Sequence, residues 1–185
     1  QSAAYCADGS NSTRPDSAQK NSRNHKRVLL LWQGPDGHPW STHEYQDGVR
    51  ILARCLDQIP NLQTIVTQAN DPWSEGPELL DGADGVLLFL AEGARWIDGS
   101  LSRRAAFERL ANRGGGLVVL HWGMGTRDAA HIDRFVKLFG GCHGGPDRKY
   151  RVLSTRGIIR SATHPVMRGI EQRLTAVFVP LPPPR

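Results

Sequence analysis

Side chains able to transfer protons, bind a metal ion or stack on a polar ring gather in three short segments of this 185-residue chain. Each segment follows a run of apolar residues that we expect to form a buried strand. The members are Asp36, His38, Trp40, His43 and Glu44 in the first segment, Glu92, Arg95 and Trp96 in the second, and His121, Trp122 and Met124 in the third. Because the carboxyl ends of parallel strands meet at one edge of a sheet, we expect the three segments to share one pocket.

His121 is the most informative of these residues. It ends an apolar run and is followed by Trp-Gly-Met-Gly, which predicts a sharp strand-to-helix turn that holds the side chain above the sheet. Since this residue is neither serine nor cysteine, acyl transfer through a covalent Ser or Cys intermediate at this turn is excluded. General acid–base catalysis and metal ligation by the imidazole both remain open, and a histidine that only holds a loop through hydrogen bonds is the alternative.

A divalent metal is a second hypothesis for the same histidines. His38, His43 and Glu44 offer two imidazoles and a carboxylate, and His121 or His143 would complete the set. No fixed helical spacing joins these residues, since His38 precedes a proline in a loop while His43 opens a helix. The candidate metal ligands are therefore His38, His43 and His121, and such donors suit zinc, manganese or iron more than calcium.

Indoles combined with imidazoles and carboxylates are typical of a pocket for a small polar ring compound. Indole faces stack on the C–H surfaces of sugars, while imidazoles and carboxylates bind hydroxyls. We expect the catalytic residues to be His121, Glu44 and Glu92. We expect the substrate-binding residues to be His38, Trp40, His43, Trp96, Trp122, His143 and Asp147.

The cysteines exclude two classes of protein. Cys6, Cys55 and Cys142 are too few for a disulfide framework, and no CxxC pair predicts a zinc ribbon. Cys55 lies in an apolar helical pattern, so we expect a buried thiol there. Cys142 lies among glycines, and no base is paired with it by any sequence rule, so a small loop residue is favoured over a nucleophile.

Strands and helices that could position these residues alternate along the chain. Continuous apolar runs predict strands that are buried on both faces, at 28–33, 62–67, 86–90, 117–121 and 150–154. Apolar spacings of three and four predict helices, namely one capped by Ser41 or Thr42 that ends before Pro60, a short one at 77–85, one at 100–112 capped by Ser100, and one at 128–139. This alternation predicts an α/β fold, a three-layer α/β/α sandwich with a mostly parallel sheet.

Composition argues against two further classes. The apolar runs are far shorter than the roughly 20 residues of a transmembrane helix, so no membrane span is expected. The net charge of +5 comes mostly from residues 1–27, since the remainder holds 18 basic and 16 acidic residues. No basic stripe with interleaved aromatics is present, which argues against a nucleic-acid partner. Residues 1–26 are almost devoid of apolar side chains and predict a disordered polar leader before a domain at 27–185.

Several ungapped strings between residues 27 and 171 resemble the ThuA-like (trehalose utilisation) family. They are 37–39 (Gly-His-Pro), 42–45 (Thr-His-Glu-Tyr), 83–85 (Ala-Asp-Gly), 92–93 (Glu-Gly), 113–117 (Arg-Gly-Gly-Gly-Leu), 120–122 (Leu-His-Trp), 141–150 (Gly-Cys-His-Gly-Gly-Pro-Asp-Arg-Lys-Tyr) and 164–165 (His-Pro). The resemblance implies a flavodoxin-like, class I glutamine amidotransferase-like fold in which His121 replaces the amidotransferase cysteine. It also implies metabolism of trehalose or keto-sugars by a hydrolase, lyase or isomerase, a carbohydrate ligand, and export after removal of a leader.

The C-terminal part departs from this resemblance. After Glu171, similar proteins continue with an acidic pair followed by aromatics, whereas this chain has Gln-Arg-Leu-Thr-Ala-Val and a proline run. We therefore expect the C-terminal part of the domain to be truncated. The alternative function is a non-catalytic carbohydrate-binding or regulatory module, an inactive truncated member of the family.

Overall fold

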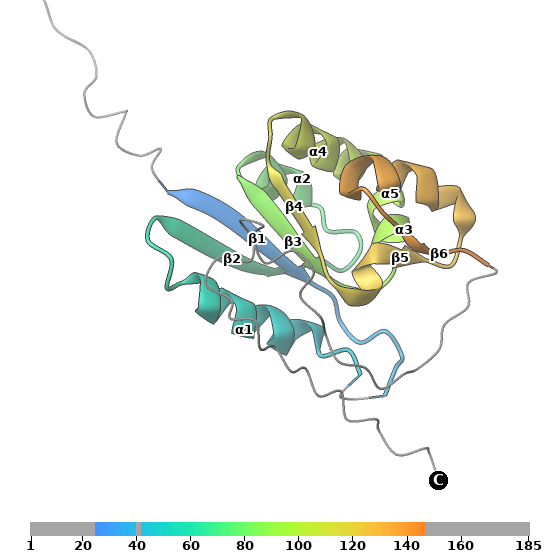
Figure 1. Cartoon of the computed structure of the whole chain (residues 1–185), viewed down its shortest axis with the longest axis horizontal. Helices are drawn as coiled ribbons and strands as arrows, with labels where there is room; N and C mark the ends of the chain where they lie inside the picture. The colour runs from blue at the N-terminus through green and yellow to red at the C-terminus, as the bar shows by residue number, and fades with distance from the viewer. Residues whose placement is uncertain (1–24, 40–41, 147–185) are drawn as a thin grey trace, which may run out of the picture. The chain divides into compact units, whose positions relative to one another are not determined.

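Four parallel strands form the central sheet of the chain, of which the computed structural model describes residues 25–39 and 42–146 (Figure 1). The strands are β1 (Lys26–Trp32), β2 (Leu62–Gln68), β3 (Gly85–Phe89) and β4 (Gly116–Val119). Their order is β2-β1-β3-β4, and each neighbouring pair is parallel. This order is the beginning of the flavodoxin-like arrangement, so the predicted parallel sheet is confirmed.

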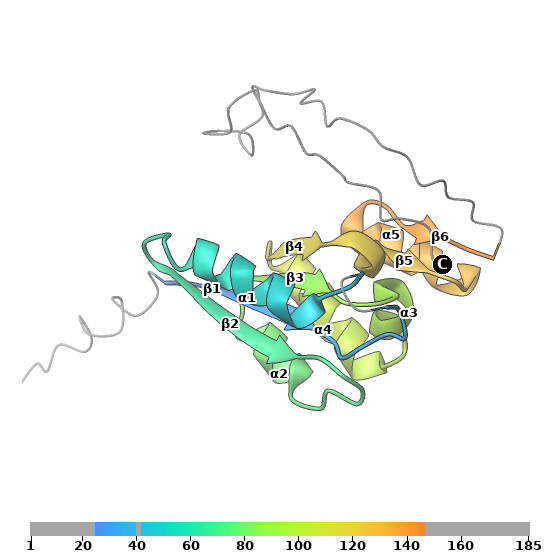
Figure 2. The ribbon, with the colours of Figure 1, turned by 90° about the horizontal axis from the view of Figure 1, so that it is seen from below.

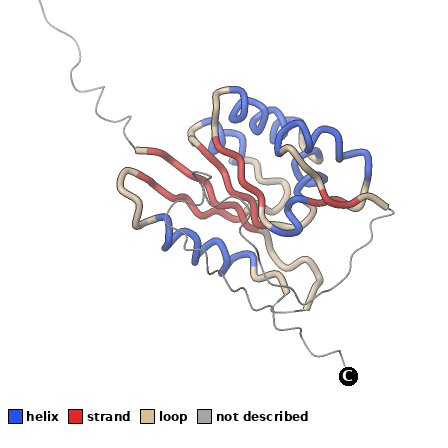
Figure 3. The backbone as a smooth tube through the Cα atoms, viewed as in Figure 1, coloured by secondary structure: helices blue, strands red, loops and turns tan. Residues whose placement is uncertain are grey.

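Helices cover both faces of this sheet, which gives the three predicted layers (Figures 1 and 2). One face carries α1 (Tyr45–Leu56), and the other carries α2 (Gly76–Asp81), α4 (Leu101–Asn112) and α5 (Ile132–Phe139). The tube in Figure 3 shows that shorter elements join them near the carboxyl ends of the strands. These are α3 (Gly93–Asp98), the 3₁₀ helices η2 (His121–Met124) and η3 (Ala129–His131), and the paired strands β5 (Gly125–Thr126) and β6 (His143–Gly144).

The central strand β1 is apolar on both faces because it separates two hydrophobic clusters. Successive side chains of a strand point to opposite faces. Leu30 packs with Val49 and Ala53 of α1 on one face. Leu29 and Leu31 pack in the larger cluster on the other face, beneath α4. The continuous apolar run therefore reflects two-sided burial, as the sequence predicted.

Several local predictions are confirmed and others are wrong. Ser100 caps α4, since its hydroxyl accepts a hydrogen bond from the backbone N–H of Arg103 at 3.3 Å. In contrast, α1 starts at Tyr45, and its N-cap is Glu44 rather than Ser41 or Thr42. The predicted leader is also one residue too long, because β1 starts at Lys26. The rest of the leader, the strand at 150–154 and the C-terminal part lie outside the described residues.

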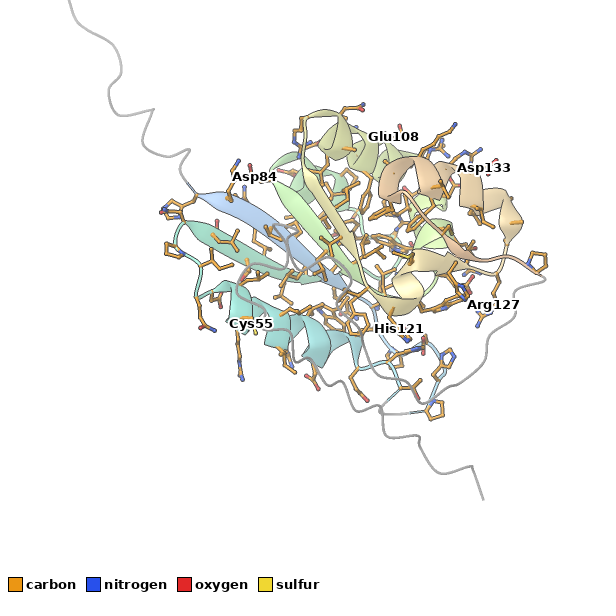
Figure 4. All side chains as sticks on the ribbon, viewed as in Figure 1. Cys55, Asp84, Glu108, His121, Arg127 and Asp133 are labelled. Atoms are coloured by element: carbon orange, nitrogen blue, oxygen red, sulfur yellow. The ribbon has the colours of Figure 1, made fainter. Side chains whose placement is uncertain are left out.

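The prediction of a buried Cys55 thiol is wrong. Cys55 is exposed on α1, as Figure 4 shows. The buried stripe of α1 is Tyr45, Val49 and Ala53, four residues apart, and Cys55 lies to one side of that stripe.

Within the described residues, we find no helix whose length and apolar character would allow it to cross a membrane.

Candidate functional site

The candidate site lies beyond the carboxyl ends of β1 and β3. These two strands are neighbours, but the chain leaves β1 toward α1 on one face and leaves β3 toward α3 and α4 on the other. Such a divergence opens a crevice in which α/β proteins bind ligands. A cavity of about 720 Å³ occupies this position. Its lining residues include Asp36, His38, Asn70, Asp71, Glu92, Arg95, Trp96, Arg103, Trp122 and Arg127.

A second hollow of about 340 Å³ shares one wall with this cavity. The shared wall runs from Gln33 to His38, and His43, Glu44 and Tyr45 line only the smaller hollow. Glu44, expected to be catalytic, thus lies in the smaller hollow, while Glu92 lies in the larger cavity. Residues from two of the predicted segments therefore line the larger cavity together with Trp122 of the third.

The carboxylate of Asp36 joins four groups at this shared wall. Its Oδ1 accepts hydrogen bonds from the backbone N–H of His38 at 3.1 Å and lies 2.9 Å from the Nδ1 of the same residue. Its Oδ2 lies 2.7 Å from Nδ1 of His43 and accepts a hydrogen bond from the Tyr45 hydroxyl at 2.7 Å. Because a carboxylate only accepts, both Nδ1 atoms carry a proton. We call Asp36, His38, His43 and Tyr45 the Asp36 cluster.

Hydrogen bonding controls the charge of this cluster. Burial alone would raise the pKa of Asp36, but hydrogen bonds from Tyr45, His38 and His43 outweigh it and hold this pKa well below the ordinary value. The pKa of Tyr45 is raised by burial and by the adjacent Asp36 carboxylate. Asp36 is therefore ionised at neutral pH and Tyr45 is a neutral donor, so the carboxylate fixes the orientation of both imidazoles.

His121 lies next to the Asp36 cluster, at the turn where β4 gives way to η2 (Figure 4). Its φ of 52° is in the left-handed region, which confirms the sharp turn that the sequence predicted. Its ring is 4.8 Å from that of His43, edge to face, and His43 is 4.5 Å from His38. Desolvation and the neighbouring His43 lower the pKa of His121, while Asp36 opposes the shift. A neutral imidazole is thus favoured.

Glu92 lines the larger cavity and is the N-cap of α3, with a φ of 45°. Its carboxylate accepts a hydrogen bond from the backbone N–H of Arg127 at 3.0 Å and another from the Arg127 guanidinium. The guanidinium also lies over the ring of Trp122, 5.7 Å from its centroid. Glu92 is therefore an ion-paired carboxylate that fixes Arg127 beside Trp122.

We predict that Gly93→Ala will destabilise this part of the site. A Cβ at Gly93 would overlap the carbonyl oxygen of Gly123, so α3 and η2 could not approach as they do. We expect a loss of about 1–3 kcal/mol in the free energy of unfolding, measured by urea denaturation. Gly141→Ala is the matched control, because a Cβ there meets nothing within 4 Å. Equal stability of the two variants would contradict the prediction.

The structure brings together donors that could hold a metal ion. One ligand atom each from Asp36, His38 and His43 lies within 4.8 Å of the other two. Two imidazoles and a carboxylate are a donor set that suits zinc, manganese or iron. A metal bound through the Nδ1 atoms would replace the two protons that now lie between the imidazoles and Asp36, so binding would release protons. His121 lies beside this set, next to His43.

Other residues expected at the site have different positions. Trp122 lines the cavity, and its ring is 6.0 Å from the exposed His143. Trp96 also borders the cavity but is only 5 % exposed, and the Arg103 guanidinium lies 4.2 Å from its centroid. Its faces are therefore largely covered by protein. Trp40 and Asp147 lie outside the described residues.

Some residues of the site were not assigned from the sequence. Asp36 was grouped with the first segment, but neither its role as shared acceptor nor that of Tyr45 was predicted. The signal available was the spacing of seven and nine residues to its partners across the Gly-His-Pro segment at 37–39, which no simple periodicity identifies. Arg103 comes from α4 and Arg127 from a loop, and no sequence pattern marked either residue.

Comparisons with known proteins support the fold. Neither a family model nor a curated protein matches the chain. The chain is similar to the crystal structure of a candidate ThuA-like protein from Bacteroides uniformis ATCC 8492, with a TM-score of 0.54 and 16 % sequence identity. The match covers 80 % of this chain and 56 % of the other, so this chain spans just over half of that protein's length. The chain has the α/β fold of this ThuA-like protein, as the sequence resemblance implied.

Proposed function

We propose that this chain is a ThuA-like carbohydrate-processing domain that acts without a serine or cysteine nucleophile. The convergence of His38, His43 and His121 beside Asp36 is the observation that carries the proposal. Asp36 and His38 lie on the wall shared by the two hollows, His43 lines the smaller hollow, and His121 lies in contact with His43. The carbohydrate substrate is inferred from the family resemblance. The mixed lining supports it, since Trp122 offers an aromatic ring and Asn70, Asp36 and His38 offer groups that bind hydroxyls.

His121 is the general acid–base in this proposal. Its lowered pKa keeps the imidazole neutral at physiological pH, the form that accepts a proton. The C–H next to the carbonyl of a keto-sugar is acidic, and its removal starts either an elimination or an isomerisation. His43 is oriented by Asp36, and its ring contacts that of His121. The imidazole of His43 therefore offers a second site for a proton beside that of His121.

The experiment that tests the function is an assay of the purified chain against a panel of sugars. The panel contains trehalose, a keto-disaccharide and its non-oxidised parent, and each is tested for binding and for turnover. Turnover of the keto-disaccharide supports the enzyme. If a sugar of the panel binds but none is turned over, a carbohydrate-binding module is favoured. If no sugar binds or is turned over, both the enzyme and the binding module are contradicted.

We further predict that the Asp36 cluster binds a divalent metal ion. The expected result is a near-stoichiometric content of zinc, manganese or iron in protein purified without chelator, measured by elemental analysis. Added zinc should also release protons as it displaces them from the Nδ1 atoms. His43→Gln should lower the affinity by about tenfold or more, because one of three donors is lost.

His25→Gln is the control for metal binding, because His25 is exposed and comes just before the amino end of β1, whereas the cluster follows the carboxyl end of that strand. A metal-free protein with full turnover would contradict the metal and leave the acid–base role of His121. Zinc binding that is unchanged in His43→Gln would place the metal elsewhere in the chain.

A further inference from the structure

Two residues that line the larger cavity, Trp96 and Arg103, form with Trp73 a group of buried hydrogen-bond donors. Across residues 25–39 and 42–146, three buried side-chain nitrogens lack a hydrogen-bond partner: Nε1 of Trp73, Nε1 of Trp96 and Nε of Arg103. They belong to side chains in contact, since the Trp73 and Trp96 rings are 5.3 Å apart and the Arg103 guanidinium lies over Trp96. Buried polar groups are normally paired, so three unpaired donors in one place indicate a missing acceptor.

The charge of this wall also indicates which acceptor is missing. Arg103 is 2 % exposed, and its one ion-pair partner among the described residues is Asp71, at 2.7 Å. The Asp71 side chain is 71 % exposed, so the counterion is well solvated while the guanidinium is not. A buried guanidinium whose Nε lacks a partner and whose carboxylate partner is solvated favours an anion over a neutral acceptor.

Arg95 adds a second positive charge to the same wall. It is exposed and lines the larger cavity, and its side chain has no hydrogen-bond or ion-pair partner among the residues that the structure describes. The other acidic residues of the lining are already engaged, Glu92 by Arg127 and Asp36 by its cluster. Arg95 is thus the arginine of the lining whose charge is not offset by a neighbouring carboxylate.

We propose that the wall formed by Arg95, Trp96 and Arg103 binds an acidic group, a carboxylate or a phosphate, carried by the ligand. A guanidinium binds either group through two parallel hydrogen bonds, and indole N–H groups donate to the same oxygens. Combined with the proposed function, on which this step rests, the ligand is an acidic carbohydrate, a sugar acid or a sugar phosphate. Its anion would lie at this wall while its ring faces Trp122 and the Asp36 cluster across the cavity.

The test compares the whole chain's affinity for methyl glucuronide, glucose 6-phosphate, methyl glucoside and inorganic phosphate by calorimetry. We expect at least one acidic sugar to bind about tenfold or more tightly than methyl glucoside, and this advantage to shrink at high salt. Whichever acidic sugar binds more tightly identifies the carboxylate or the phosphate as the natural group. Arg95→Gln should abolish the advantage, and Arg103→Lys should reduce it because lysine lacks the planar fork.

Arg54→Gln is the matched control, because Arg54 is an exposed arginine of α1 that lines neither cavity. The substitution removes the same charge as Arg95→Gln. Equal affinity for acidic and neutral sugars, or an advantage that survives in Arg95→Gln, would overturn the inference. If the chain binds a neutral sugar as tightly as the acidic sugars, the anion site is refuted but the proposed carbohydrate function is not. Phosphate bound in an Arg95-dependent manner without any sugar keeps the anion site and refutes the carbohydrate proposal.

Discussion

Replacing His121 with glutamine is expected to reduce turnover of a keto-disaccharide by about 10²–10⁴-fold, with little loss of sugar binding. Glutamine keeps a hydrogen-bonding group of similar length at the turn, but its amide cannot accept and return a proton. The measurement is a steady-state comparison of kcat in the two proteins, together with calorimetric binding of the unreactive parent sugar. A fall in kcat with an unchanged dissociation constant would assign His121 to the chemical step.

The pH dependence of the unmodified protein provides an independent readout. The lowered pKa of His121 means that the imidazole loses its proton below the ordinary value of 6.5. The neutral form is the base, so kcat/KM should rise with pH, with the midpoint of the rise below pH 6.5. This acid-side rise should be absent from the residual activity of His121→Gln.

His25→Gln is the control for His121 as well, since His25 is an exposed histidine outside the site. Unchanged turnover in His121→Gln would contradict the acid–base role. A rate that instead falls as the pH rises through the pKa of His121 would show that the imidazole must be protonated to act, in which case His121 serves as an acid rather than a base.

The sequence predicts the central fold well because the sheet is buried on both faces. All four strands of the central sheet were located to within two residues at each end, since each is a continuous apolar run bounded by turn residues. The short helix α3 was not predicted, because its six residues have no helical repeat and lie where a loop was expected. The exposed Cys55 shows a related limit, since neighbouring leucines in the sequence do not define the angular width of a buried stripe.

The position of the site could be predicted, but its internal geometry could not. Strand ends locate the loops, so the grouping of His38, Glu92 and Trp122 around one cavity follows from topology. Which carboxylate meets which imidazole depends on the path of the loop between β1 and α1, which no repeat encodes. The ring of Trp96 is a further example, because its faces pack against Trp73 and Arg103, and the sequence does not show that they are covered although the residue lines the cavity.

Asp36→Asn is expected to have the second large effect, because it removes the acceptor on which the Asp36 cluster depends. The carboxylate receives Tyr45 and both imidazoles, whereas asparagine offers one oxygen, and its NH₂ group would face the Nδ1–H of an imidazole. We expect one histidine to rotate or change tautomer, and turnover to fall by about 10²–10⁴-fold, as when an orienting carboxylate is lost from other histidine sites. Nitrogen chemical shifts of the imidazoles, measured by NMR, would report the tautomer directly.

Stability and metal binding should respond to the same substitution. Hydrogen bonds to a charged group contribute about 1.5–3 kcal/mol, so we expect a loss of that order in the free energy of unfolding. Because the pKa of Asp36 is depressed below its ordinary value of 3.8, the stabilisation from its carboxylate is fully present above pH 3.8 and is lost as the pH falls through the lower folded-state value. The stability gap between the two proteins should therefore narrow in acid.

Asp47→Asn is the matched control, since Asp47 is an exposed aspartate of α1 whose ion pair with Arg50 spans 3.5 Å. It should change the free energy of unfolding by about 0.5 kcal/mol or less and leave the imidazole spectra as they are. If Asp36→Asn kept both histidine tautomers and full turnover, the carboxylate would be a structural acceptor without influence on the chemistry. If it lost zinc affinity but kept the tautomers, Asp36 would act as a metal ligand rather than as the group that orients His38 and His43.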